Sequence, residues 1–185
     1  MSKVLILSIL FFLGCSVKYP KVEIVKTDKL FVKKLNQDKI EEIQHLYNQL
    51  IELSENVSID EAQNLASSIV VYSMYLSNKY KLVSPPNFQN FLVNIKIKER
   101  GLCYQWMYDL SSFIGKNRYE TFDFYYAVDN LNTIFEHNVF VITAKKELFK
   151  SGIVIDPWRN SGAIHSVKIE DDKNYKWTKR VKVFD

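Results

Sequence analysis

The sequence predicts an α+β domain in which N-terminal helices pack on a C-terminal antiparallel sheet. Between residues 38 and 115 apolar residues recur at helical spacing, and from residue 122 on they alternate or form β-branched runs. Helices that precede strands, instead of alternating with them, are typical of this class. With 185 residues, 47% of them hydrophobic, the chain is long enough for one sizeable core and too short for two.

The first two helices are predicted from their N-terminal capping patterns. The first begins at Asp38, where Glu41 three residues later completes a capping box. Ser58 and Glu61 repeat this pattern at the start of the second helix. Apolar residues at i, i+3 and i+4 follow both starts, so each helix has a face suited to a core.

Two further helices are predicted between residues 85 and 115. Pro85-Pro86 is expected to end the second helix, and Asn87 to cap a short third one. The fourth begins at Gly101–Cys103 and ends at Gly115. The later period-two and β-branched runs predict strands at Phe122–Val128, His137–Ala144, Gly152–Ile155, Ser166–Ile169 and Val181–Phe184.

The N-terminal residues 1–14 are typical of a signal peptide. Lys3 precedes an apolar run of ten residues, which spans about 15 Å as a helix and is too short to cross a bilayer. Phe12-Leu13-Gly14-Cys15 resembles a bacterial lipobox. The resemblance implies lipidation of Cys15 and a lipid-anchored protein of the bacterial cell envelope, with Ser16 favouring the outer membrane. An ordinary cleaved signal peptide is the alternative. Residues 15–35 are then expected to be a tether with one short strand at Lys21–Lys26, and residues 36–185 a single domain.

Charge and composition exclude several partners. The net charge of +4 comes from 25 basic and 21 acidic residues that form no basic stripe, so no nucleic-acid partner is expected. The three histidines and the cysteines lack the spacing of metal ligands, and no phosphate-binding glycine motif occurs, so neither a metal nor a cofactor is expected. With Cys15 lipidated, Cys103 would be the remaining thiol, either buried and inert or kept for its reactivity.

Three motifs place a nucleophile, a base and a carboxylate at the ends of predicted elements. Cys103 begins a helix, whose N-terminal N–H groups favour a thiolate and can stabilise an oxyanion. His137 opens a strand and can accept the thiol proton. Asp156 is expected to end the next strand, because Pro157 follows it, and can orient the imidazole. The alternatives are a core cysteine, a structural histidine and a turn aspartate.

These residues, in the order helix-start Cys, strand His and strand Asp-Pro, resemble the transglutaminase-like branch of the papain-type cysteine enzymes. Gly-x-Cys before an aromatic residue, His before a Val-rich strand, and Asp-Pro-Trp after a hydrophobic strand are the matching motifs, within residues 87–160. The resemblance implies a papain/transglutaminase-like core. It also implies a triad acting on amide or acyl substrates through a thioester, with Cys103 as nucleophile, His137 as general acid and base, and Asp156 as orienting carboxylate.

Five further residues are weaker candidates for substrate binding or an oxyanion hole: Gln89, Asn94, Gly101, Trp158 and Arg159. The first two lie upstream of the nucleophile. The glycine would let a substrate backbone approach the sulfur. The last two directly follow Asp156, although packing of Trp158 under the sheet is an equally open interpretation.

Three functions follow from these expectations. The first is an envelope lipoprotein that hydrolyses amide bonds in a protein or peptide, a peptidoglycan peptide included. The second transfers the acyl group to an amine instead, which the sequence does not separate from hydrolysis because both share the first half-reaction. The third is a catalytically inactive binding or scaffold lipoprotein that uses the same cleft.

Overall fold

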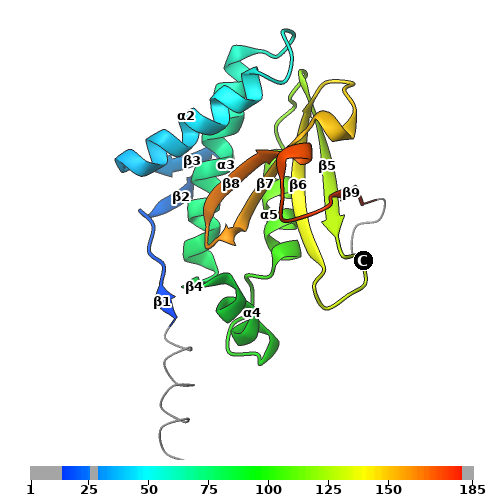
Figure 1. Ribbon diagram of the computed structural model, residues 1–185. Coiled ribbons are helices and arrows are strands. Elements are labelled where there is room, and N and C mark those ends of the chain that lie inside the picture. The colour runs from blue at the N-terminus through cyan, green and yellow to red at the C-terminus, as the bar shows by residue number, and fades with distance from the viewer. Residues whose placement is uncertain (1–13, 26–28, 181–185) are drawn as a thin grey trace, which may run out of the picture.

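The computed structural model describes residues 14–25 and 29–180. A five-stranded antiparallel sheet forms its centre, with helices on one face (Figure 1). The strands lie in the order β8-β7-β6-β5-β9, with β5 at Phe122–Asp129, β6 at His137–Ala144, β7 at Ile153–Asn160, β8 at Ala163–Lys168 and β9 at Thr178–Lys179. The predicted α+β class with an antiparallel sheet is confirmed.

Among the described residues, four helices precede the sheet: α2 (Gln37–Ile51), α3 (Ile59–Lys79), α4 (Pro86–Asn94) and α5 (Cys103–Ile114). Helices α3 and α5 pack on the sheet and α2 packs on α3, and the apolar faces of the three helices share one core with the facing side of the strands. Leu65 and Ile69 of α3, Leu110 of α5 and Ile155 of β7 have no exposed surface there. Burial of such side chains contributes about 2 kcal/mol each, which holds α5 against the sheet.

Two predicted helix starts need comparison with the structure. Ser58 caps α3, since its side chain accepts a hydrogen bond from Glu61 N, as predicted. The prediction that Asp38 begins α2 was wrong by two residues, because Asn36 is the cap and accepts from Lys39 N at 3.4 Å. Both Asn and Asp are good caps, so the sequence pattern alone does not separate them.

The role predicted for the two prolines was also wrong. Helix α3 ends at Lys79, and Lys81 with a φ of 50° turns the chain away before Pro85-Pro86 is reached. The prolines instead begin α4, with Pro85 at the cap and Pro86 in the first turn, so Asn87 is not the cap. Proline suits a first helical turn because its missing N–H would have no helical partner there.

The two faces of the sheet are covered differently. One face packs on α3 and α5, while Val139, Val141 and Val154 on the other pack under Ile169 and Trp177 of the C-terminal segment. In Figure 1 this segment crosses the sheet opposite the helices. Central strand β6 is therefore buried along its whole length, which accounts for its continuous apolar run.

Strand β7 does not stop at Pro157 as expected. It continues to Asn160, but its pairing with β6 ends at Ile155 and its register with β8 shifts between Asp156 and Asn160. A proline is tolerated at such an irregularity because no ladder hydrogen bond is required of it. Asp156 consequently lies at the last regular pair, opposite His165.

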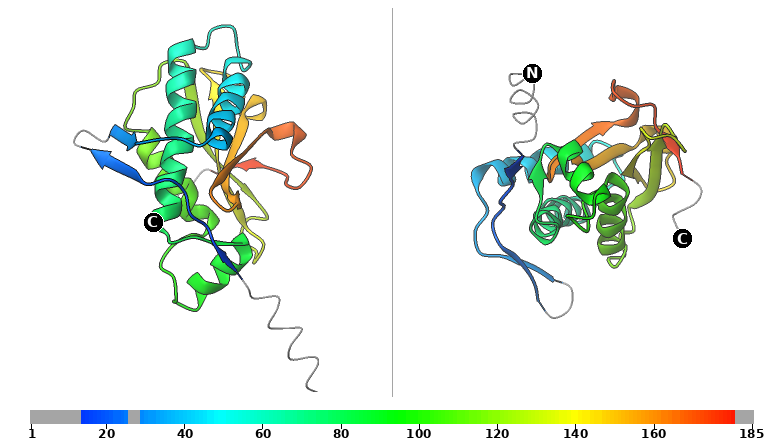
Figure 2. Two further views of the ribbon diagram at one scale, coloured as in Figure 1. Left: turned by 90° about the vertical axis from the view of Figure 1, so that its left-hand side faces the viewer. Right: turned by 90° about the horizontal axis from the view of Figure 1, so that it is seen from below.

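The N-terminal segment expected as a tether is attached to the body from its start. Strand β1 (Cys15–Ser16) pairs with β4 (Val83–Ser84), and β2 (Val22–Val25) pairs with β3 (Lys29–Val32). Buried Val22 packs against Val71 and Met74 of α3, and Figure 2 shows this hairpin crossing the helix. The strand expected at Lys21–Lys26 is thus observed as β2.

The predicted strand at Val181–Phe184 and residues 1–13 of the predicted signal peptide lie outside the described residues. Within the described ranges, no helix is long and apolar enough to cross a bilayer.

Candidate functional site

Cys103 is the first residue of α5, as the sequence predicts. The preceding Leu102 is extended, and Gln105 Oε1 accepts from Leu102 N at 3.0 Å and from Gly101 N at 2.7 Å. The Gln105 side chain thus holds the backbone of the two residues that precede the helix. The thiol is 9% exposed and lies 3.8 Å from Glu136 O, at the start of β6. The sulfur therefore sits between a helix N-terminus and the first residue of the central strand.

His137 and Asp156 form a buried pair on the adjacent strands β6 and β7. The distance from His137 Nε2 to Asp156 Oδ2 is 2.7 Å, and the two residues are 3% and 1% exposed. Cys103 lines the same cavity as His137 and acts to raise the pKa of the imidazole. The structure thus brings the three predicted residues together in the order thiol, imidazole, carboxylate.

The electrostatics of the pair favour an imidazolium. Burial disfavours the charged form of His137, but the hydrogen bond and charge of Asp156, together with Cys103, outweigh it and raise its pKa to about 9. Burial acts to raise the pKa of Asp156, yet the hydrogen bond and charge of His137, with Arg159 beside it, hold that pKa below its usual value. Asp156 is therefore a carboxylate at neutral pH.

Arg159 supports Asp156 and does not reach the cavity, so the expected substrate contact is not observed. Its Nε donates to Asp156 Oδ2 at 3.1 Å, and its Nη2 donates to Asp172 Oδ2 at 2.7 Å. Asp172 in turn accepts from Trp177 Nε1 at 2.9 Å. Two buried carboxylates need a counter-charge, and the guanidinium between them supplies it.

Aromatic rings surround the imidazole. The ring centroids of Trp158, Tyr175 and Trp177 lie 4.7, 4.8 and 5.5 Å from that of His137. Trp158 lines the cavity beside the thiol and donates from Nε1 to Asn90 Oδ1 at 3.0 Å, so it connects α4 to the site while it also packs against the main core. The rings limit water around the histidine and hold its orientation.

A cavity of about 310 Å³ opens over these groups, between α4 and the β5–β6 loop. It is lined by Asn87, Asn90, Cys103, Asn130, Ile134, Phe135, Glu136, His137, Trp158 and Tyr175. Asparagine amides, a thiol and an imidazole beside apolar side chains are suited to an uncharged polar group such as an amide.

Besides Arg159, three more of the weaker candidates do not line this cavity. Gln89 is buried, accepts from Val83 N at 3.0 Å and donates to Arg100 O at 2.7 Å, so its amide holds two backbone segments together. Gly101, with a φ of 132°, faces Gln89, and a Cβ there would lie 2.6 Å from Gln89 Cγ. A glycine is therefore required at position 101 because the backbone packs closely against Gln89, and not because a substrate approaches there. Asn94 is exposed at the end of α4.

Sequence reasoning missed several lining residues. Asn87 and Asn90 are three apart on α4, so helical spacing was an available signal that they share a face. Tyr175 lies in the C-terminal segment, where no pattern pointed to the site. Both groups reach the cavity through contacts between distant parts of the chain.

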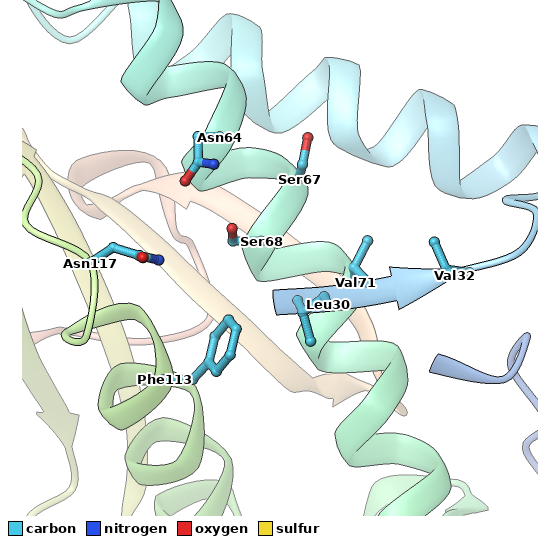
Figure 3. A pocket seen from close by; sticks show the side chains of 8 residues that line it. All are labelled: Leu30, Val32, Asn64, Ser67, Ser68, Val71, Phe113 and Asn117. Atoms are coloured by element: carbon cyan, nitrogen blue, oxygen red, sulfur yellow. The ribbon is translucent and has the colours of Figure 1, made fainter. Parts of the chain in front are cut away.

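A second hollow, of about 370 Å³, lies between α3, α5 and β3 (Figure 3). Its polar lining groups are the amides of Asn64 and Asn117 and the hydroxyls of Ser67 and Ser68. No histidine lines it to activate a hydroxyl, which makes the Cys103 cavity the better candidate for chemistry.

Within the described residues, no three His, Cys, Asp or Glu side chains gather as a metal site requires. No family model, curated protein or solved structure matches the chain. The functional argument therefore rests on the geometry of the site.

Stability should depend on pH through His137. Because its pKa is about 9 in the folded protein and near 6.5 when unfolded, its contribution is complete below pH 6.5 and is lost as the pH rises through 9. We expect the free energy of unfolding to fall by up to about 3 kcal/mol over this window, relative to His137→Gln. Urea unfolding at successive pH values measures this free energy for the wild type and for His137→Gln. Parallel pH profiles for the two proteins would contradict the prediction.

Proposed function

We propose that this protein is a lipid-anchored cysteine hydrolase of the bacterial cell envelope, with a papain/transglutaminase-like core. It would act on amide or peptide bonds through a thioester at Cys103. The observation that carries the proposal is the buried, hydrogen-bonded pair of His137 and Asp156, whose imidazole lines the same open cavity as the Cys103 thiol. A cysteine or histidine with a purely structural role would not need a thiol, an imidazole and a carboxylate to lie together beside a cavity that is open to solvent.

The chain's own residues supply each step. Cys103 Sγ attacks the carbonyl carbon, and its proton resides on His137, which Asp156 keeps charged and oriented. The carbonyl oxygen becomes an oxyanion beside the first N–H groups of α5. His137 protonates the departing amine, which leaves a thioester, and then accepts a proton from the water that hydrolyses it. An amine in place of water would give acyl transfer by the same route.

An activated ester tests the nucleophile directly. On incubation with an aryl ester of an N-acylated amino acid, intact mass spectrometry should show one acyl group added at Cys103. Cys103→Ala should lose the adduct entirely, and His137→Gln should form it far more slowly. Cys103→Ala keeps the fold if its thermal unfolding matches the wild type. No adduct, or one formed equally fast without His137, would reject the hydrolase and favour the binding lipoprotein.

Asn90 is expected to complete the oxyanion site. Its Oδ1 accepts from Trp158, and no described protein group accepts from its Nδ2, which is left for a substrate. Asn90→Ala should lower the acylation rate about 100-fold. Alkylation of Cys103 by iodoacetamide, which forms no oxyanion, should change little.

Asn94→Ala is the matched control for Asn90, because it removes the same side chain from the exposed end of the same helix. It should leave both rates unchanged. Equal acylation rates in the two variants would remove Asn90 from the proposed oxyanion site.

A further inference from the structure

Among the described residues, six of the eleven exposed large apolar side chains gather at the end that holds the candidate site. Ile134 is 94% exposed, Phe135 74% and Ile97 66%. They belong to two segments, the loop after α4 and the β5–β6 loop, which lie at the same end of the molecule in Figure 1. We define the apolar rim as the exposed residues Phe91, Ile95, Ile97, Leu131, Ile134 and Phe135.

Cys15 is fixed at this same end. It is exposed, and strand β1 pairs it with Ser84, two residues before α4 begins. Gly14 contacts the ring of Phe88 on α4. Helix α4 then lines the cavity opposite Ile134 and Phe135, so contacts link Cys15, α4 and the rim. Figure 2 shows β1 beside this helix.

A lipid on Cys15 would therefore hold the rim against the bilayer. The chain is paired with the body from residue 15 onward, so no slack separates the anchored residue from the fold. A flexible tether would allow any orientation, whereas this attachment allows few. The surface that lies next to the anchor is the one that exposes apolar side chains.

The rim also has the charge expected of a surface that contacts anionic lipid. Ile95-Lys96-Ile97-Lys98 alternates apolar and basic residues. Ile97 shares a hollow with Lys79, Lys81 and Lys98, although Glu99 is also there. Apolar side chains among lysines are the composition of segments that lie in the membrane interface.

We infer that the apolar rim inserts into the bilayer surface, so that the Cys103 cavity opens at the membrane. This inference rests on the anchor in the proposed function and extends it to the substrate. The substrate would be an amide-bearing group presented at the lipid surface, such as a membrane-attached peptide. A protein that covers the rim instead is the competing occupant.

Depth-dependent quenching of added tryptophans tests the inference. The lipidated chain is reconstituted in vesicles of phosphatidylcholine and phosphatidylglycerol, with or without bromine on the acyl chains. The added emission of Ile134→Trp and Ile97→Trp should fall about twofold or more in the brominated vesicles. Leu148→Trp and Ile59→Trp are the matched controls, since both replace exposed apolar residues at the opposite end. Their added emission should not change.

Quenching that is absent at the rim, or equal at both ends, would overturn the inference, as would mass spectrometry that finds no lipid on Cys15. The result does not depend on catalysis. In a Cys103→Ala background the same pattern is expected, because no step of membrane contact uses the thiol. A failed acylation experiment thus leaves this inference intact, and a failed quenching experiment leaves the hydrolase intact.

Discussion

Replacing His137 with glutamine should slow alkylation of Cys103 by iodoacetamide at pH 6 by about 100-fold. The imidazolium, with a pKa of about 9, remains charged at pH 6 and favours the thiolate beside it. A cysteine without such a partner has a pKa of about 8.5 and is less than about 1% thiolate at that pH. The difference between the two proteins should shrink as the pH approaches 9. Alkylation rates measured from pH 5 to 10 give both profiles.

His45→Gln is the control for this experiment, because His45 is exposed on α2 and outside the cavity. Its profile should overlay that of the wild type. If the wild-type rate rises only above pH 8, or if the His137 variant reacts as fast at pH 6, the thiol and imidazole are not coupled. The triad proposal would then lose its basis.

Asp156→Asn should affect both stability and reactivity. Without the carboxylate charge, only Cys103 opposes the effect of burial, so the pKa of His137 should fall well below about 9. The partly buried Arg159 also loses one of its two carboxylate partners, one that is itself buried, which should lower the free energy of unfolding by about 3 kcal/mol. Acylation should slow on the order of 10³-fold, since the imidazole is neither charged nor held. Titration of the imidazole by NMR, urea unfolding and acylation kinetics measure the three effects.

Asp123→Asn provides the comparison for a surface carboxylate. Asp123 pairs with Lys145 at 2.6 Å in an exposed position, and its loss should cost less than about 1 kcal/mol. An Asp156 variant that unfolds no more readily than this one, with an unchanged His137 titration, would show that the buried carboxylate does not control the histidine.

Helix and strand positions were predictable where one local feature decides them. The Ser58 cap, the end of α5 at Gly115 and the bounds of β6 at His137–Ala144 all follow from adjacent residues. Errors arose where one residue type fits two roles. Pro85-Pro86 is compatible with the end of one helix or with the start of another. Because the chain already turns at Lys81, the two prolines begin α4 instead of ending α3.

The candidate site, like the fold, has one part that was predictable from local sequence and another that was not. The sequence by itself determined that Cys103 begins a helix, that His137 begins a strand and that Asp156 lies on the next strand, because each placement depends on a few neighbouring residues. Tertiary structure decided what surrounds them. In the folded chain Gln89 hydrogen-bonds the backbone of two segments, and Arg159 donates to Asp172. Asn90 accepts a hydrogen bond from Trp158, which is 68 residues away in the sequence. Such pairings arise from packing between distant elements, which no local pattern records.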